Sequence, residues 1–195
     1  MSGLEVTVAA PLDTVWKALR DEEVVRRWHG WDYDGLDAEV EQIYFTDVVE
    51  DGHVLALSGG DRFRLTPSGE GTAVVLDRAP RGDDADAFHD LVTEGWTTFL
   101  QQLRFAVERQ PGAERRTLYF SGDGPATTLL ETVDLDGEPW FRSANQVGVT
   151  VDAWGEGLLV LVDAPSAMAV LSTYGLDDEA FAELEARWTA LWAAR

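Results

Sequence analysis

The stretch that decides the fold runs from Asp84 to Arg109 and reads DADAFHDLVTEGWTTFLQQLRFAVER. Its apolar residues recur three and four positions apart, so they share one stripe of a long helix. Asp83 or Asp84 is expected to cap the first turn, and Pro111-Gly112 to end the helix. The apolar stripe comprises Phe88, Leu91, Val92, Trp96, Phe99, Leu103 and Ala106.

Gly95 lies inside this stripe, directly before Trp96. A glycine in the middle of a helix costs about 1 kcal/mol relative to alanine, so we expect another part of the molecule to approach the backbone closely there. The long helix is therefore predicted to lie across a curved sheet, with space for a ligand between them.

The composition is that of an ordinary globular protein, with 45% hydrophobic residues in a chain of 195. This length suits one large domain or two small ones. No apolar run reaches the ~18 residues of a membrane helix, and the N-terminus lacks the features of a secretory signal. The chain has no cysteine, which excludes disulfides and thiolate chemistry and favours a reducing, cytoplasmic compartment.

The net charge of −21 is shared by both halves of the chain. Residues 1–110 hold 10 Lys and Arg against 22 Asp and Glu, and residues 111–195 hold 5 against 14. Such a field repels phosphate backbones and anionic membranes, so neither nucleic acid nor a membrane is expected as a partner. The charge favours solubility; attraction to a basic partner protein is the alternative.

The segments before the long helix alternate like strands, after two short helices. A strand is predicted over residues 3–10, a helix from Pro11 over LDTVWKALRD, and a helical turn from Glu22 to Trp28. Strand-like segments follow at 38–45, 48–50, 53–58, 61–66 and 72–78, separated by glycine-containing turns.

The second part of the chain partly repeats this pattern after a linker at 110–116. Strands are predicted at 117–121, 146–151, 157–164 and 168–173, and Pro125 precedes a helical ATTLLETVDL as Pro11 precedes LDTVWKALRD. The ending, LDDEAFAELEARWTALWAAR, parallels the long helix, and Trp140-Phe141 parallels Trp28. Two tandem β-α-β-β-β-α units are predicted.

The first unit resembles the SRPBCC superfamily, also known as the START or birch-pollen-allergen-like fold. The opening VAAPLDTVWKALRDEEVVRRWHG is most similar to the branch named after the activator of the heat-shock-protein ATPase. Gly95-Trp96 with Leu100 and Leu103 resembles its last helix. The stretches GGDRFR at 59–64 and Gly71-Thr72 resemble its strand landmarks, although they lie closer together than is usual.

The resemblance covers about residues 4–108 and implies an α+β, helix-grip-like fold, in which a curved antiparallel sheet holds the long helix around an apolar cavity. Residues 1–110 are thus expected to form this unit. Residues 113–195 form either a degenerate second unit or an extension packed on the first. A tandem pair can imitate a dimer within one chain, so we expect a monomer.

The candidate ligand-binding residues lie at the expected cavity mouth and wall. His29 lies between Trp28 and Trp31, where packing is the default and a general-acid or ligand-anchoring role the alternative. Arg62 and Arg64 share one strand face, which is either interior and able to hold a carboxylate or exposed to solvent. The full set is Trp28, His29, Trp31, Tyr44, Arg62, Arg64, Gly95, Trp96 and Phe99.

No cofactor or metal is expected. The three histidines, His29, His53 and His89, lack zinc spacing, and the chain contains no phosphate-loop or dinucleotide fingerprint. His53 lies in no pattern that indicates a function, and His89 is expected to face solvent.

The expected function is non-catalytic binding of an apolar or amphipathic small molecule between helix 84–109 and the sheet, in a pocket touching Trp96 and Phe99. Two alternatives remain at this point. One is an interaction protein similar to the chaperone-ATPase activators, which needs an exposed patch. The other is a cyclase or hydrolase, which needs convergent ionisable groups in the cavity, with His29, Glu94 or Arg62 as candidates.

Overall fold

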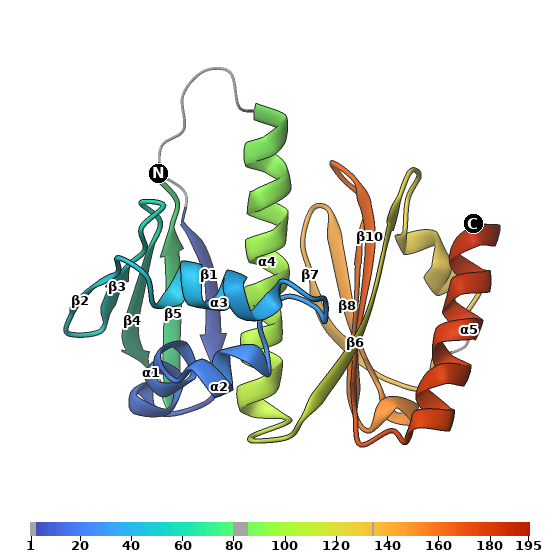
Figure 1. The fold of residues 1–195 in the computed structure, drawn as a ribbon, viewed down its shortest axis with the longest axis horizontal. Helices are drawn as coiled ribbons and strands as arrows, with labels where there is room; N and C mark the ends of the chain where they lie inside the picture. The colour runs from blue at the N-terminus through green and yellow to red at the C-terminus, as the bar shows by residue number, and fades with distance from the viewer. Residues whose placement is uncertain (1–2, 80–85, 134) are drawn as a thin grey trace. The chain divides into compact units, whose positions relative to one another are not determined.

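The chain divides into two compact units in the computed structural model, which describes residues 3–79, 86–133 and 135–195, without the side chains of 86–89. The first unit comprises residues 1–89 and 95–112, and the second comprises residues 90–94 and 113–195. Each unit contains a five-stranded antiparallel sheet and a long helix (Figure 1). The predicted α+β class, with antiparallel sheets and a long helix, is therefore confirmed.

The first sheet has the strand order β1-β5-β4-β3-β2, so the first and last strands of the unit are neighbours. Its strands are β1 (Leu4–Val8), β2 (Val49–Asp51), β3 (Val54–Ala56), β4 (Arg62–Ser68) and β5 (Gly71–Asp77). Its helices are α1 (Leu12–Arg20), α2 (Glu22–Arg26), α3 (Leu36–Tyr44) and α4 (Asp86–Glu108).

The alternation of buried and exposed residues along the strands shows which side of this sheet is covered. Val6 and Val8 of β1, and Phe63 and Leu65 of β4, are buried between exposed neighbours. α4 packs on the buried side, where the Trp96 and Phe63 rings lie with centroids 5.5 Å apart. Figure 1 shows α4 running beside the sheet.

The Gly71-Thr72 pair has a clear structural reason. A Cβ atom at Gly71 would overlap the carbonyl oxygen of Val8, so β5 can begin beside the end of β1 only with glycine there. The adjacent Thr72 hydroxyl donates to the Ala10 carbonyl oxygen at 2.9 Å. These contacts hold the chain after β1 against the start of β5.

The segment predicted as a strand at 38–45 is helical, and this prediction was wrong. Leu36, Val40 and Tyr44 are buried at intervals of four residues, which is the period of a helix face. Arg20 of α1 donates to the Tyr44 carbonyl oxygen and pairs with Glu50 at 2.6 Å. α1 and β2 therefore hold the end of α3 in place.

α4 ends close to where the sequence predicts, with Glu108 as its last helical residue. The Asp83 or Asp84 cap lies outside the described residues, and so does the side chain of His89. Along the described part, Trp96, Leu100, Leu103 and Phe105 are buried. Of the predicted stripe, Trp96 and Leu103 are buried, Val92, Phe99 and Ala106 are half-buried, and Leu91 is exposed, so the packing face covers only part of that stripe and adds Leu100 and Phe105.

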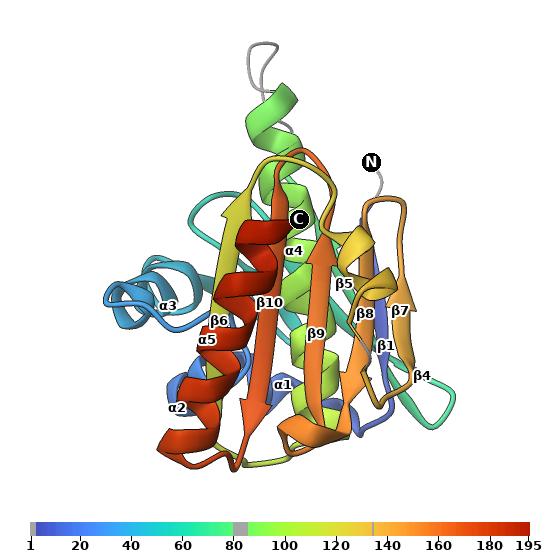
Figure 2. The same cartoon turned by 90° about the vertical axis from the view of Figure 1, so that its right-hand side faces the viewer.

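The second sheet repeats the strand order of the first, as β6-β10-β9-β8-β7. Trp188 of α5 packs against Trp154, with ring centroids 5.7 Å apart, and Figure 2 shows α5 crossing one face of the sheet. The elements are β6 (Arg115–Gly122), the 3-10 turn η1 (Thr127–Glu131), β7 (Pro139–Arg142), β8 (Gln146–Val151), the 3-10 turn η2 (Asp152–Trp154), β9 (Gly157–Val162), β10 (Ala167–Tyr174) and α5 (Asp178–Ala194).

The second unit departs from the predicted repeat in two places. The stretch after Pro125 forms only the short turn η1 instead of a helix like α1. Trp140 and Phe141 lie in β7, so they are not counterparts of Trp28, which follows α2. Four strands, not three, separate the first helical segment from the last helix in each unit.

Candidate functional site

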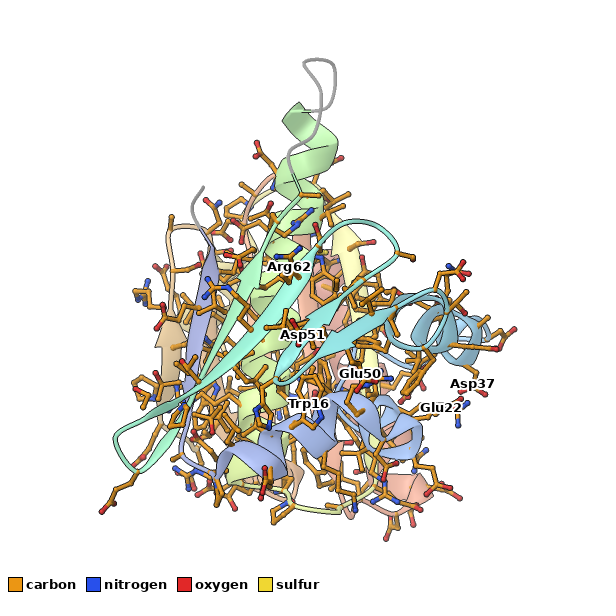
Figure 3. The ribbon with its side chains drawn as sticks, turned by 90° about the vertical axis from the view of Figure 1, so that its left-hand side faces the viewer. Trp16, Glu22, Asp37, Glu50, Asp51 and Arg62 are labelled. Carbon is orange, nitrogen blue, oxygen red and sulfur yellow. The ribbon has the colours of Figure 1, made fainter. Side chains whose placement is uncertain are left out.

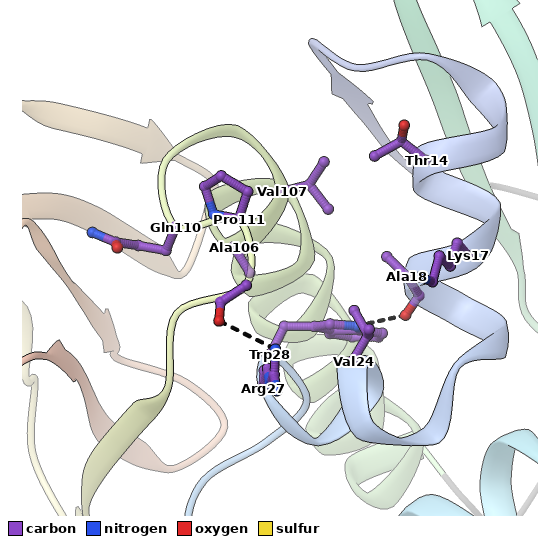
Figure 4. Close-up of a pocket in the computed structure, with 11 residues that line it drawn as sticks. Thr14, Lys17, Ala18, Val24, Arg27, Trp28, Ala106, Val107, Gln110 and Pro111 are labelled. Carbon is purple, nitrogen blue, oxygen red and sulfur yellow. Dashed lines mark hydrogen bonds between the residues drawn. The ribbon is translucent and has the colours of Figure 1, made fainter.

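A cleft of about 280 Å³ lies in the first unit, where α1, α2 and the end of α4 meet (Figure 4). Its apolar lining comes from all three helices, which bring together residues far apart in the sequence. The lining includes Ala18 of α1, Val24 of α2, Trp28 after α2, Ala106 and Val107 of α4, and Pro111.

Trp28 forms one wall of this cleft and is almost completely buried. Its indole N–H donates to the Ala18 carbonyl oxygen at 2.8 Å, as Figure 4 shows. A buried indole without an acceptor would be costly, so this bond fixes the ring plane. The Trp28 wall is therefore formed before any ligand arrives.

The opposite wall is held by contacts to the turn that follows α4. The Arg27 guanidinium donates to the Gly112 carbonyl oxygen at 3.2 Å. Gly112 has a φ of +78°, a left-handed conformation that suits glycine and lets the chain leave the helix. Nearby, the Gln102 side chain donates to the Gly30 carbonyl oxygen at 3.0 Å and ties α4 to the loop after α2.

Two cations, Lys17 and Arg27, line the cleft. The Lys17 side chain is 71% exposed and lies 3.8 Å from Asp21. The cleft therefore combines an apolar floor with local positive charge, in a chain whose net charge is −21.

The far side of Trp28 contacts a cluster of buried rings. Its indole lies edge-on to His29 and to Tyr44, with centroids 5.7 Å away in both cases. His29 in turn lies 4.3 Å from the Phe99 ring, and Phe99 lies 5.7 Å from Trp96. Trp28 thus belongs both to the cleft lining and to this ring cluster.

The ring cluster unites six of the predicted site residues and adds one that the sequence did not indicate. Trp31 joins through Phe99, at 6.2 Å between centroids. Phe63 of β4 joins through Trp96 and Tyr44 and was not predicted. The cluster consists of Trp28, His29, Trp31, Tyr44, Phe63, Trp96 and Phe99.

These rings occupy the position between α4 and the sheet that was predicted to be a cavity. The described cleft is lined by Trp28 but by neither Trp96 nor Phe99. The sequence therefore identified residues that meet in space, and the cleft at Trp28 is a different opening from the one predicted beside Trp96 and Phe99. Aromatic contacts of this kind contribute about 0.5–1.5 kcal/mol each beyond area burial, so the cluster stabilises the unit.

A chain of ionisable groups runs from the ring cluster to the surface. The Tyr44 hydroxyl lies 2.9 Å from His29 Nδ1, and both residues are fully buried. His29 Nε2 lies 3.6 Å from Glu39 Oε1, and the Tyr33 hydroxyl donates to Glu39 Oε2 at 2.6 Å. Glu39 therefore connects a buried imidazole with an exposed phenol.

The pKa values of this chain follow from these contacts. The His29 imidazole is the main cause that lowers the pKa of the Glu39 carboxyl, against the opposing effect of burial. The hydrogen bond to Glu39 raises the pKa of Tyr33 to about 12. Burial raises the pKa of Tyr44 well above its usual value, so this phenol stays protonated.

Arg62 and Arg64 lie on the exposed side of β4, so the expectation that they border an interior cavity was wrong. Their neighbours Phe63 and Leu65 occupy the covered side. Arg64 instead forms a paired contact with Asp77, at 2.6 and 3.1 Å, on the outside of the sheet. Figure 3 shows Arg62 on the outer surface, over the strand.

Gly95 does not mark a close approach of another element, contrary to prediction. A Cβ atom built there would meet only the Phe99 ring, at the ordinary distance of 4.0 Å. No packing requirement among the described residues therefore explains this glycine.

Glu94, a candidate for catalysis, groups with the second unit and is engaged there. Its carboxylate accepts hydrogen bonds from the side chains of Asn145 at 2.8 Å and Gln146 at 2.5 Å. His53 lies edge-on to Trp16 at 5.5 Å, and its Nε2 lies 3.8 Å from Asp13. Neither Glu94 nor His53 lines the cleft at Trp28.

The described residues include no group of three His, Asp or Glu side chains placed to hold a metal ion. Within the same ranges, no helix combines the length and the apolar character needed to cross a membrane.

No family model and no curated protein matches this chain. Among solved structures, the Aha1 dimer from Colwellia psychrerythraea is similar over 56% of this chain and 97% of its own, with 17% identity and a TM-score of 0.43. DynU16, from the dynemicin biosynthetic locus, is similar over 97% of this chain and 94% of its own, with 17% identity and a TM-score of 0.40.

The di-domain ARO/CYC StfQ from the steffimycin biosynthetic pathway is similar over 89% of this chain and 84% of its own, with 11% identity and a TM-score of 0.42. Matches of this strength say nothing about the activity of this chain, which must be argued from its own residues.

Proposed function

We propose that the first unit binds a small amphipathic molecule with an apolar ring body and an anionic group in the cleft at Trp28. The observation that carries this proposal is an apolar cleft with fixed walls and two cations, Lys17 and Arg27, among its lining residues. The resemblance of residues 4–108 to the SRPBCC superfamily agrees with a binding role, although the cleft at Trp28 lies among α1, α2 and the end of α4 and not between α4 and the sheet.

The size of the cleft restricts the ligand. Ligand pockets are commonly about 300–1,000 Å³, and this one, at about 280 Å³, is just below that range. It suits one or two fused rings and not a lipid chain. Lys17 and Arg27 are the ionisable residues of the lining, so the charges nearest the ligand favour an anion. Asp21 at 3.8 Å from Lys17 and the −21 charge of the chain reduce this preference.

Catalysis in this cleft is not favoured by the same observations. A general acid and base would have to converge on the bound molecule, but the ionisable lining residues are both cations. The acid and base groups around His29 lie on the other side of Trp28, within the ring cluster. An interaction surface is also not favoured, because the large exposed apolar residues of the described part, Tyr33, Val49 and Leu91, lie on separate segments.

The proposal is tested with 1-naphthoate and its neutral analogue 1-naphthamide, titrated by fluorescence into the full chain. We expect naphthoate to bind more tightly than naphthamide. The Lys17→Gln variant should lower the ratio of the two affinities about two- to fivefold, which is the effect of losing one exposed ion pair. Native mass spectrometry of freshly purified protein would show a retained natural ligand.

A filling variant locates the site. Ala106→Phe places a ring in the cleft and should abolish naphthoate binding, whereas Ala186→Phe, at an exposed position of α5, should leave it unchanged. Wild-type affinity in a folded Ala106→Phe variant would show that the molecule binds elsewhere and would overturn the proposal.

A further inference from the structure

The second unit contains a larger cleft, of about 620 Å³, at the β7 edge of its sheet. Its wall is formed by Leu130 of η1 and by Val133, Leu135, Gly137 and Glu138 before β7, and its floor is β8. The sequence predicted a cavity in the first unit only. The apolar lining includes Leu130, Val133 and Leu135 from the wall, and Val147 and Val149 from the floor.

The wall of this cleft is fixed to β8 by its backbone. Glu138 N–H donates to the Thr150 hydroxyl, and Thr150 N–H donates to the Glu138 carbonyl oxygen, both at 2.8 Å. Asp152 N–H donates to the Asp136 carbonyl oxygen at 2.9 Å. A Cβ atom at Gly137 would overlap the carbonyl oxygen of Thr150, so only glycine allows this approach.

The ring of Phe141 is fixed by a second glycine. A Cβ atom at Gly148 would overlap this ring, so Phe141 lies directly over the backbone of β8. The pairing of β7 with β8 shifts register between Pro139 and Phe141. Such an irregularity changes the direction of side chains, and here both Trp140 and Phe141 line the cleft.

The charges of this cleft balance. Glu138 precedes β7 and Arg142 ends it, and these are the ionisable residues of the lining. One acid and one base give no net preference for a charged ligand, while the −21 charge of the chain disfavours anions at long range. The volume lies inside the range of about 300–1,000 Å³ that is usual for small-molecule sites.

We propose that this second cleft is a binding site for a neutral, largely apolar ring molecule, larger than the ligand of the first cleft. Its apolar side chains and two rings supply the contact area, and the two glycine-dependent contacts keep the cleft open without a ligand. The proposal is independent of the function proposed for the first unit, because the two lining sets share no residue.

N-phenyl-1-naphthylamine, a neutral probe with three rings that fluoresces in apolar surroundings, tests this site in the full chain. Leu130→Trp fills the cleft and should weaken binding at least tenfold, whereas Leu91→Trp, a matched change at an exposed position outside it, should leave binding unchanged. Ala106→Phe, which fills the first cleft, should also leave it unchanged.

Trp140→Leu provides a second variant that removes one ring and is expected to weaken binding about three- to tenfold. Far-ultraviolet circular dichroism and thermal unfolding establish that each variant is folded. Absence of binding to the wild type, loss of binding in Ala106→Phe, or wild-type affinity in a folded Leu130→Trp variant would each overturn the proposal.

Discussion

Tyr44 and His29 form the buried polar contact on which the ring cluster depends. Tyr44→Phe removes the hydroxyl that lies 2.9 Å from His29 Nδ1 and leaves a buried imidazole nitrogen without that partner. Such a loss costs about 1–3 kcal/mol. We expect urea unfolding to show this decrease in the free energy of unfolding.

The double variant Tyr44→Phe with His29→Phe is the control for this prediction. It removes both polar groups, so its destabilisation should be smaller than the sum of the two single changes. Additive effects would mean that the two side chains do not depend on each other.

Glu39 gives the first unit an acid-dependent contribution to stability. Because His29 lowers the pKa of Glu39 below its ordinary value of 4.5, the carboxylate form is favoured in the folded state. This contribution is present above pH 4.5 and is lost as the pH falls through the lowered folded pKa. Wild type should therefore lose stability relative to Glu39→Gln on acidification below pH 4.5, measured by urea unfolding at several pH values.

Tyr33 provides an independent readout of the same contact. Its pKa of about 12 should fall toward 10 in Glu39→Gln, because the hydrogen bond to the carboxylate is the main cause of the rise. Ultraviolet absorbance of phenolate during alkaline titration measures this change. An unchanged titration curve would contradict the contact between Tyr33 and Glu39.

Gly95→Ala should stabilise the protein. A Cβ atom has room there, so the variant gains the helix propensity of alanine, about 0.5–1 kcal/mol, without a clash. Thermal unfolding should show a higher midpoint, and a lower one would mean that the backbone at this position is needed as glycine.

Six residues of the ring cluster could be predicted because aromatic residues next to apolar periodic segments pack together. Glu39 and Tyr33 could not, since the segment that contains Glu39 was predicted as a strand. The Leu36, Val40 and Tyr44 spacing was the available helical signal, but Val40, Ile43, Tyr44 and Phe45 are β-branched or aromatic residues that favour strands. Tertiary packing therefore decided between helix and strand for this segment.

At the level of elements, several close backbone approaches require glycine, and two of them show why such contacts could not be predicted from the sequence. Gly71 lies against Val8, and Gly137 lies against Thr150, in each case where two segments distant in sequence meet. The resemblance indicated Gly71 without its physical reason, and nothing indicated Gly137. Such contacts depend on the register of strand pairing, which short apolar patterns do not determine.

Gly137→Ala should therefore lower the free energy of unfolding of the second unit. The decrease should be several times larger than the increase expected from Gly95→Ala. The new methyl group must displace the backbone of β8 and break the hydrogen bonds between Glu138 and Thr150. Hydrogen exchange should show the lost protection in β7 and β8, with the first unit unaffected. Equal protection from exchange in the variant and in the wild type would contradict the inference that the wall of the second cleft is fixed.

For the whole molecule, the net charge of −21 should make stability depend on salt. Repulsion between surplus carboxylates opposes the compact state, and salt shortens the screening length from about 30 Å at 0.01 M to about 10 Å at 0.1 M. We expect the unfolding midpoint to rise over this range, equally in NaCl and KCl. A falling midpoint would mean that the exposed ion pairs outweigh the repulsion.

The repeated strand order has a consequence for synthesis on the ribosome. In each sheet the first strand pairs with the last. Leu4 of β1 therefore cannot pair until Leu76 of β5 has been synthesised, and Arg115 of β6 cannot pair until Tyr174 of β10 has been synthesised. The first sheet cannot be completed until β5, which ends at Asp77, has left the exit tunnel, and the second cannot be completed until β10, which ends at Tyr174, has left it. The ribosome therefore completes the strands of the first sheet before those of the second. A pause in translation between the two would let the first sheet form before the strands of the second could compete for pairing.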